Sequence, residues 1–320
     1  MKKYKSLPLI ATLLLTYGIV WALMALGIVN DYSFAVIVTI CINIILATSL
    51  NLVTGFTGQF SLGHAGFMSI GAYTCALITK SNPTIPGFLL GVAAGATLAA
   101  VVGVLVGLPT LRLRGDYLAI ATLGMAEIIR VVFLNMKITN GAAGLSFLPQ
   151  FVNWNWLFLF TAGTILLLRN FLNSSPGRAC ISVREDEIAA ESMGVNTTKY
   201  KVTAFSMGAF FAGVAGALYA SYFYFLKPDL FNFNKSIDIL VIVVLGGMGS
   251  LSGSVIAAVL LQLISTWLAA FPEIRMVLYA AMLVAIMLFR PQGLLGSTEV
   301  TDVITRGLSR FGRRKKEEEV

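Results

Sequence analysis

Residues 33–66 read SFAVIVTICINIILATSLNLVTGFTGQFSLGHAG, and this stretch decides the fold. Its first part, 33–53, contains no charged side chain, whereas its second part, 54–66, is rich in glycine. A bilayer core roughly 30 Å thick is crossed by about 20 helical residues, so 33–53 predicts a membrane-spanning helix. The glycine-rich part predicts a broken backbone, which at membrane depth needs protein or water around it to satisfy its polar groups.

The rest of the chain has the same apolar character. Of its 320 residues, 57% are hydrophobic and 12% are charged, whereas soluble domains carry about 25% charged residues. The other apolar segments are 7–29, 86–108, 117–134, 154–168, 202–225, 237–270 and 276–289. They predict an all-α fold, a polytopic transmembrane helix bundle of about eight to ten segments that forms one domain over 1–320. The first segment is long and lacks a small-x-small cleavage site, so we expect a retained helix and not a signal peptide.

Lysine and arginine are distributed unevenly between the two ends of the predicted helices. In an alternating topology, segments on one side hold 17 of the 23 basic residues, and segments on the other side, which include 226–236, hold five. Basic residues favour cytoplasmic loops, so both termini are predicted to be cytoplasmic, together with the loop 169–201 and the basic tail 290–320. The net charge of +8 therefore reflects membrane topology and contact with membrane lipid, and we expect no nucleic-acid partner.

Two glycine-interrupted regions, 54–66 and 245–254, each lie between apolar arms. In the alternating topology both are approached from the outside, which suggests a parallel internal repeat. Paired glycine breaks point to the substrate pathway of transporters, although small residues also allow close helix packing. The candidate pathway residues in the two regions are Gly58, Gln59, Ser61, His64, Gly247 and Ser250.

Few residues are suited to chemistry. Glu127 and Arg130 are three positions apart in a predicted helix and share a face. They form either a structural ion pair or a polar contact near the pathway, which makes Glu127 a further pathway candidate. His64 is the only histidine, the three cysteines show no metal spacing, and the chain has no Gly-x4-Gly-Lys-Ser/Thr phosphate loop. We therefore expect no metal, no cofactor and no catalytic residue, and a chain that is not an enzyme.

The predicted cytoplasmic loop 169–201 is long enough for one or two short helices, and its segment 176–195 is expected to be amphipathic and helical. Its apolar positions are Ala179, Val183, Ile188, Ala189 and Met193. Gly194 suits the C-terminus of this helix. Such a helix lies on lipid or fits a groove on a partner protein. Its charged residues are mostly acidic, which favours docking to a protein.

Four motifs give the chain a specific resemblance. They are GFTGQFSLGHAGF (55–67), RGDYLAIATLG (114–124), REDE with AAESMG (184–187 and 189–194), and VLGGMGSLSG (244–253). With these motifs the chain resembles, over about 35–295, the LivM-type inner-membrane permeases of bacterial high-affinity branched-chain amino acid ABC importers. The resemblance implies a system with a second homologous permease, two ATPase subunits that bind the ATP, and a periplasmic binding protein that delivers leucine, isoleucine or valine.

The resemblance also implies which residues couple the chain to its ATPase partners. ABC permeases carry an Ala-Ala-x3-Gly core, which Ala189, Ala190 and Gly194 match. The glutamate that usually precedes this core is replaced by Ile188, with Glu187 one place earlier. Related permeases import urea, short amides or other amino acids, so these substrates stay open. A different alternative is a self-sufficient secondary carrier with Glu127 as its coupling-ion site.

Overall fold

A computed structural model describes residues 7–268, apart from 28, 112 and 114, and a few isolated positions beyond 268. The predicted segment 276–289 and the basic tail 290–320 therefore lie outside the described residues. The long helices are α1 (Leu7–Ala25), α2 (Asp31–Asn51), α3 (His64–Ser81), α4 (Ile85–Thr110), α5 (Asp116–Asn135), α6 (Trp154–Asn173), α9 (Thr197–Ala220), α10 (Phe233–Gly246) and α11 (Leu251–Trp267). Two short helices, α7 (Ser175–Glu185) and α8 (Glu187–Ser192), separate α6 from α9.

The predicted all-α transmembrane class is confirmed. Five described helical runs are long and apolar enough to cross a membrane, and they are 31–56, 85–110, 116–135, 154–173 and 197–220. Shorter apolar helices cover 11–25 and 251–267. The one sheet within the described residues is a two-stranded antiparallel pair of β1 (Leu145–Ser146) and β2 (Phe225–Leu226). The chain is therefore a multi-pass membrane protein.

Small residues set the packing at the centre of the bundle, where α3, α4 and α9 lie against one another. A Cβ added to Gly71 of α3 would stand 2.0 Å from the carbonyl oxygen of Gly213 on α9. A Cβ added to Gly216 would stand 1.9 Å from the carbonyl oxygen of Met68. Such close backbone approach replaces the hydrophobic effect as the source of helix association in lipid.

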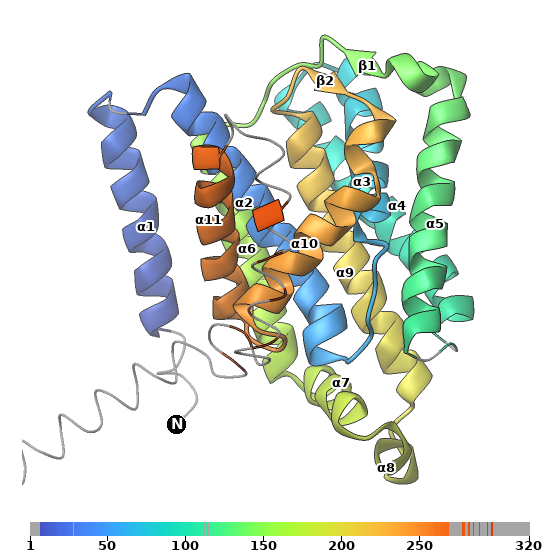
Figure 1. The fold of residues 1–320 in the computed structure, drawn as a ribbon. Helices are drawn as coiled ribbons and strands as arrows, with labels where there is room; N and C mark the ends of the chain where they lie inside the picture. The colour runs from blue at the N-terminus through green and yellow to red at the C-terminus, as the bar shows by residue number, and fades with distance from the viewer. Residues whose placement is uncertain are drawn as a thin grey trace, which may run out of the picture.

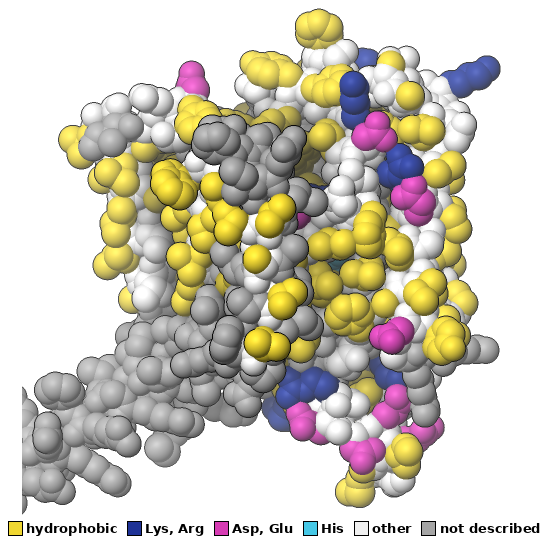
Figure 2. All heavy atoms as spheres, in the orientation of Figure 1, with side chains coloured by type: hydrophobic (Ala, Val, Ile, Leu, Met, Phe, Trp, Pro, Cys, Tyr) yellow, Lys and Arg dark blue, Asp and Glu magenta, His cyan; other side chains and the backbone are white. Residues whose placement is uncertain are grey.

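The outer surface has the character expected of a lipid-facing bundle. Large apolar side chains such as Leu105 on α4 and Ile120 on α5 are exposed. Hydrophobic side chains cover much of the middle of the face in Figure 2, and charged ones gather towards both ends, at one of them around α7 and α8. In Figure 1, β1 and β2 lie at the opposite end of the bundle from α7 and α8. An apolar middle with charged side chains towards both ends is the pattern expected of a bundle that spans a membrane.

Candidate functional site

The first glycine region begins where α2 ends. The helix continues past Asn51 as a single π-helical turn, η2 (Leu52–Phe56), and α3 begins only at His64. π-helical turns are rare in proteins, and those that occur often lie at functional sites. Gly58 has φ +73°, a backbone conformation that favours glycine. The first part of the break is enclosed by protein, since every residue of η2 is buried.

The second glycine region is a tight turn between α10 and α11. Gly247 has φ +107° and Gly249 has φ +94°, so both need glycine to avoid strain. The hydroxyl of Ser250 then accepts a hydrogen bond of 3.1 Å from the amide of Gly253 and caps α11. The candidate residues Gly247 and Ser250 therefore shape the turn itself.

The two glycine regions meet each other through the amide side chain of Asn51. Its nitrogen donates to the carbonyl oxygen of Ser250 at 2.8 Å and to the hydroxyl of Ser254 at 2.7 Å. Its oxygen accepts from the amide of Gly249 at 2.8 Å. A Cβ added to Gly55 would stand 2.4 Å from that same Gly249 nitrogen. We call residues 52–63 and 247–250 together the glycine junction.

Asn51 is a functional candidate that the sequence analysis missed. The available signal was an amide within the apolar run 33–53, directly before the glycine-rich part. A buried amide in a membrane segment is expected to find polar partners, but its partners lie about two hundred residues further along the chain. No rule of sequence spacing links Asn51 to partners so far away in the chain.

The helices that lead into the glycine junction run in the same direction. Asn43 of α2 accepts a hydrogen bond from Lys235, near the start of α10, and Asn51 contacts the turn at the end of α10. α11 returns in the opposite direction, so that Gln262 accepts a hydrogen bond from Asn43. Both breaks are therefore approached from one side of the bundle, and the internal repeat stays a prediction.

A side chain from the predicted cytoplasmic loop reaches the glycine junction. Nη1 of Arg184, near the end of α7, donates to the carbonyl oxygen of Gly55 at 2.7 Å. A Cβ on Gly249 would stand 2.8 Å from this Nη1 atom, and a Cβ on Gly58 would stand 3.0 Å from Cγ of Arg184. Small residues therefore make room for one arginine between the two breaks. Arg184 opens the REDE motif (184–187), and the sequence alone indicated no role for it.

Of the one or two short helices allowed by the sequence, the structure has two, so the apolar positions of 176–195 do not share one continuous helical surface. The segment forms two helices that are separated by Asp186, which has extended backbone angles of φ −157° and ψ 110°. The carboxylate of Asp186 accepts hydrogen bonds from the amides of Ile188 at 2.9 Å and Ala189 at 3.0 Å. This cap starts a new helix in a new direction. As a result Val183 packs on the bundle and Ile188 is 70% exposed.

The predicted coupling residues lie on and around α8. Glu187 forms an ion pair of 2.7 Å with Lys201 at the base of α9. Ala190 is buried, whereas Ala189 is exposed. Gly194 has φ +83° and, as predicted, follows the end of the helix. The amide of Gly194 donates to the carbonyl of Glu191 and that of Val195 to the carbonyl of Ala190, as in a Schellman C-cap.

A cavity of about 270 Å³ separates α8 from the glycine junction. Its lining includes Gly58, Gln59, Arg184, Glu187 and Lys201. The side-chain amide of Gln59 is buried, and neither its oxygen nor its nitrogen has a hydrogen-bond partner among the described residues. A buried amide is expected to find polar partners, so Gln59 offers a donor and an acceptor beside the cavity.

Two of the predicted pathway residues are held inside the packed bundle. Nε2 of His64 lies 2.8 Å from the hydroxyl of Ser49 on α2. The hydroxyl of Ser61 accepts a weak hydrogen bond of 3.4 Å from the amide of Gly63. His64 and Ser61 are 3% and 2% exposed. They therefore brace the start of α3 and line none of the cavities described here.

Glu127 lies away from the glycine junction. It pairs with Arg130 one turn along α5, and Arg130 also pairs at 2.9 Å with Asp229 of the 3-10 turn η5 (Pro228–Phe231). Glu127 is 47% exposed at its side chain. This geometry favours the interpretation as a structural ion pair, which ties α5 to the loop before α10.

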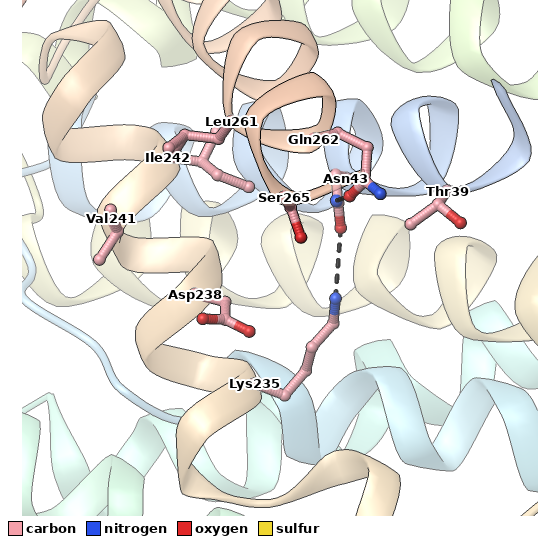
Figure 3. Close-up of a pocket in the computed structure, with 9 residues that line it drawn as sticks. All are labelled: Thr39, Asn43, Lys235, Asp238, Val241, Ile242, Leu261, Gln262 and Ser265. Atoms are coloured by element: carbon pink, nitrogen blue, oxygen red, sulfur yellow. Dashed lines mark hydrogen bonds between the residues drawn. The ribbon is translucent and has the colours of Figure 1, made fainter. Parts of the chain in front are cut away.

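Polar side chains surround another cavity, of about 210 Å³, between α2, α10 and α11. Figure 3 shows Lys235 and Asp238 projecting from α10 towards Asn43 of α2 and Ser265 of α11. Nζ of Lys235 donates to the amide oxygen of Asn43 at 3.2 Å. The sequence analysis placed Lys235 in the outer segment 226–236, but α10 begins at Phe233, so Lys235 is helical.

In the part of the chain that the structure describes, no group of three or more His, Cys, Asp or Glu side chains could hold a metal ion. The cysteines Cys41, Cys75 and Cys180 are all free and buried.

Comparison with known proteins places this architecture in a family. The family described as branched-chain amino acid transport system / permease component matches residues 32–287. The LivM permease protein of Salmonella typhimurium is 37% identical over 89% of this chain and 74% of its own length. Escherichia coli LivM is 39% identical over 80% of this chain and 68% of its own length. Escherichia coli LivH is 27% identical over 81% of this chain and 92% of its own length. No solved structure matches the chain. The chain belongs to the family of branched-chain amino acid transport permeases.

Proposed function

We propose that the chain is the membrane-spanning permease subunit of an ABC importer in the bacterial inner membrane. It translocates leucine, isoleucine and valine, which a periplasmic binding protein delivers, and it pairs with a second, homologous permease. Two partner ATPase subunits bind and hydrolyse the ATP, so this chain is not itself an enzyme. Both termini and the 169–201 loop face the cytoplasm. The names of the LivM and LivH relatives, which are high-affinity branched-chain amino acid transport permeases, support this proposal.

The surface of α8 suits docking to the ATPase subunit. Ile188 and Met193 are 70% and 85% exposed, although both are large and apolar. The caps at Asp186 and Gly194 fix both ends of this short helix. An exposed apolar tip on a rigid, capped helix fits a groove on a partner protein.

The contact between Arg184 and Gly55 is the observation that carries the proposed mechanism. It joins the segment that docks to the ATPase with the two glycine breaks, and it does so through one hydrogen bond of 2.7 Å. Movement of α7 and α8 on ATP binding therefore pulls on η2 and on the turn at Gly249. Because Asn51 ties these two breaks together, they move as one unit and the membrane pathway alternates its opening.

A self-sufficient carrier has less support. Its coupling-ion site would be Glu127, but Arg130 already neutralises that carboxylate. An ion-coupled carrier needs a site whose charge the ion itself compensates.

Uptake into proteoliposomes tests the proposed function. The chain is reconstituted with its second permease and ATPase subunits, and the binding protein is added with radiolabelled leucine. We expect uptake that requires ATP and the binding protein. Uptake by the chain alone, driven by a proton or sodium gradient, would contradict the proposal.

Docking can be tested at Gly194. Its φ of +83° suits glycine and, less well, asparagine. Gly194→Arg is expected to insert into the membrane but to lose co-purification with the ATPase subunit, whereas Gly194→Asn should retain most of it. Equal co-purification of both variants would rule out docking at the end of α8.

A further inference from the structure

The polar cavity between α2, α10 and α11 lies on the same three helices that build the glycine junction. Asn43 borders the cavity and Asn51 holds the junction, eight positions further along α2. At 1.5 Å per residue, about 12 Å of helix separates the two sites. Any movement of the junction therefore changes the position of α10 and α11 around the cavity.

The cavity presents one positive and one negative side chain, both from the first two turns of the apolar helix α10. Lys235 and Asp238 stand three positions apart on α10 and share a face. Charged side chains within membrane helices are costly and mark substrate or ion pathways. Asn43 and Gln262 add two amides to the same wall, and their side chains are joined at 3.0 Å.

The remaining wall of the cavity is aliphatic. Val241 and Ile242 from α10 and Leu261 from α11 line it, and each is less than 5% exposed. A volume of about 210 Å³ is below the roughly 300–1,000 Å³ of pockets for drug-sized ligands. The cavity therefore fits a small molecule with a charged end and an apolar end (Figure 3).

We propose that this cavity is a transit site for a free amino acid with an aliphatic side chain. Lys235 faces the α-carboxylate, Asp238 faces the α-ammonium group, and the wall of Val241, Ile242 and Leu261 receives the side chain. A neutral amide such as urea uses neither charge and leaves the aliphatic wall empty. This inference rests on the proposed function and adds where in the membrane the substrate is recognised.

The internal contacts of the cavity make it a weak site. Nζ of Lys235 already donates to Asn43 at 3.2 Å, so an incoming carboxylate has to compete for the ammonium group. Exchange of one set of polar contacts for another gives a small net free energy. A solute can then enter and leave quickly, as passage across a membrane requires.

The first test removes each charge from the cavity in the full reconstituted complex. We expect Lys235→Met and Asp238→Asn to reduce ATP-driven leucine uptake by roughly 30-fold, because each leaves one charge of the ligand uncompensated. Lys137→Met, the same change at an exposed position outside the cavity, should leave uptake within about twofold. ATP hydrolysis stimulated by the loaded binding protein should persist in all three variants, which shows that the complex is folded and assembled.

Uptake by the Lys235→Met or Asp238→Asn complex at the wild-type rate would overturn the transit site while leaving the proposed function intact. If the wild-type complex shows no ATP-driven leucine uptake, the proposed function fails instead. The two failures are therefore distinguishable.

The second test does not depend on uptake. Thr39 lines the cavity, so Thr39→Cys in the assembled complex gives a thiol that a small methanethiosulfonate reagent can label, with the labelled peptide quantified by mass spectrometry. We expect millimolar leucine to slow this labelling several-fold and the same concentration of urea to leave it unchanged. Equal protection by both, or by neither, would overturn the proposal.

Discussion

The glycine junction and the cavity at Lys235 are built from the same three helices but have opposite character. At the junction, the side chain of Asn51 makes four hydrogen bonds to backbone or hydroxyl groups, and the backbones approach too closely for a Cβ. In the cavity, two charged side chains border a hollow of about 210 Å³. The contrast indicates a division of labour, in which a closely packed, hydrogen-bonded region carries movement and a hollow, charged region carries solute.

The largest expected effect follows from adding one methyl group to the junction. A Cβ at Gly55 would stand 1.8 Å from the side-chain oxygen of Asn51 and 2.4 Å from the amide of Gly249. Gly55→Ala should therefore destabilise the purified protein by about 3 kcal/mol and abolish transport. Gly124→Ala is the control, because nothing lies within 4 Å of its added Cβ. Equal thermal unfolding of the two variants in detergent would show that the junction is not closely packed.

Two asparagines on α2 allow a direct comparison of the junction with the cavity. Asn51→Leu removes the partner of the enclosed Gly249 amide and should cost about 2–3 kcal/mol of stability. Asn43→Leu removes the hydrogen bonds of Asn43 to Lys235 and Gln262. These two partners border a cavity that water can enter, so the loss of stability should be smaller. Thermal stability and leucine uptake are measured for each variant. Asn51→Leu should lower stability and uptake, whereas Asn43→Leu should lower mainly uptake. The division of labour does not hold if both variants change in parallel.

A smaller effect on stability is expected at the contact between α7 and the glycine junction. Arg184→Met removes the hydrogen bond to Gly55 and should change stability by about 1 kcal/mol. Leucine uptake should fall about tenfold relative to ATP hydrolysis, because hydrolysis no longer moves the junction. Arg178→Met is the matched control, since Arg178 lies on the same helix but donates, among the described residues, to the carbonyl of Asn173 in α6 at 2.9 Å. A ratio of uptake to hydrolysis that is unchanged in Arg184→Met would show that coupling takes another route.

The smallest functional effect concerns a thiol on α7. Burial raises the pKa of Cys180 to about 11, and a hydrogen bond with Thr57 lowers it in part. Maleimide labelling of Cys180 at pH 8 should therefore be on the order of 100-fold slower than labelling of a Met193→Cys control, which is exposed. Because the folded pKa is raised, this group's contribution to stability is complete below about pH 9, its ordinary value, and is lost as the pH rises towards 11. Rapid labelling at pH 8 would mean that α7 leaves the bundle readily.

Local sequence patterns predicted most of the helices because each apolar run satisfies its own backbone hydrogen bonds. The two glycine breaks and the end of α8 at Gly194 were also predictable, since glycine marks backbone conformations that other residues avoid. The position of the break between α7 and α8 was missed, because the capping carboxylate of Asp186 outweighs the helical periodicity around it.

The functional contacts were harder to predict because they join distant parts of the chain. Arg184 reaches Gly55 from 129 positions away, and Lys235 reaches Asn43 from 192. From the sequence, Lys235 was assigned to a loop and Asp238 to an apolar run. The reason is that the start of α10 was predicted too late in the chain. Only the fold brings these side chains to one cavity.

The central claim is that movement of the ATPase-docking segment passes through Arg184 into the glycine junction. Met248 lies in the second break and is 44% exposed, so Met248→Cys is a suitable reporter. Its labelling rate is measured in the assembled complex without nucleotide and after trapping with ATP and vanadate. The rate should differ between the two states in the presence of Arg184 and become equal in Arg184→Met. The same nucleotide-dependent difference in both backgrounds would contradict the account.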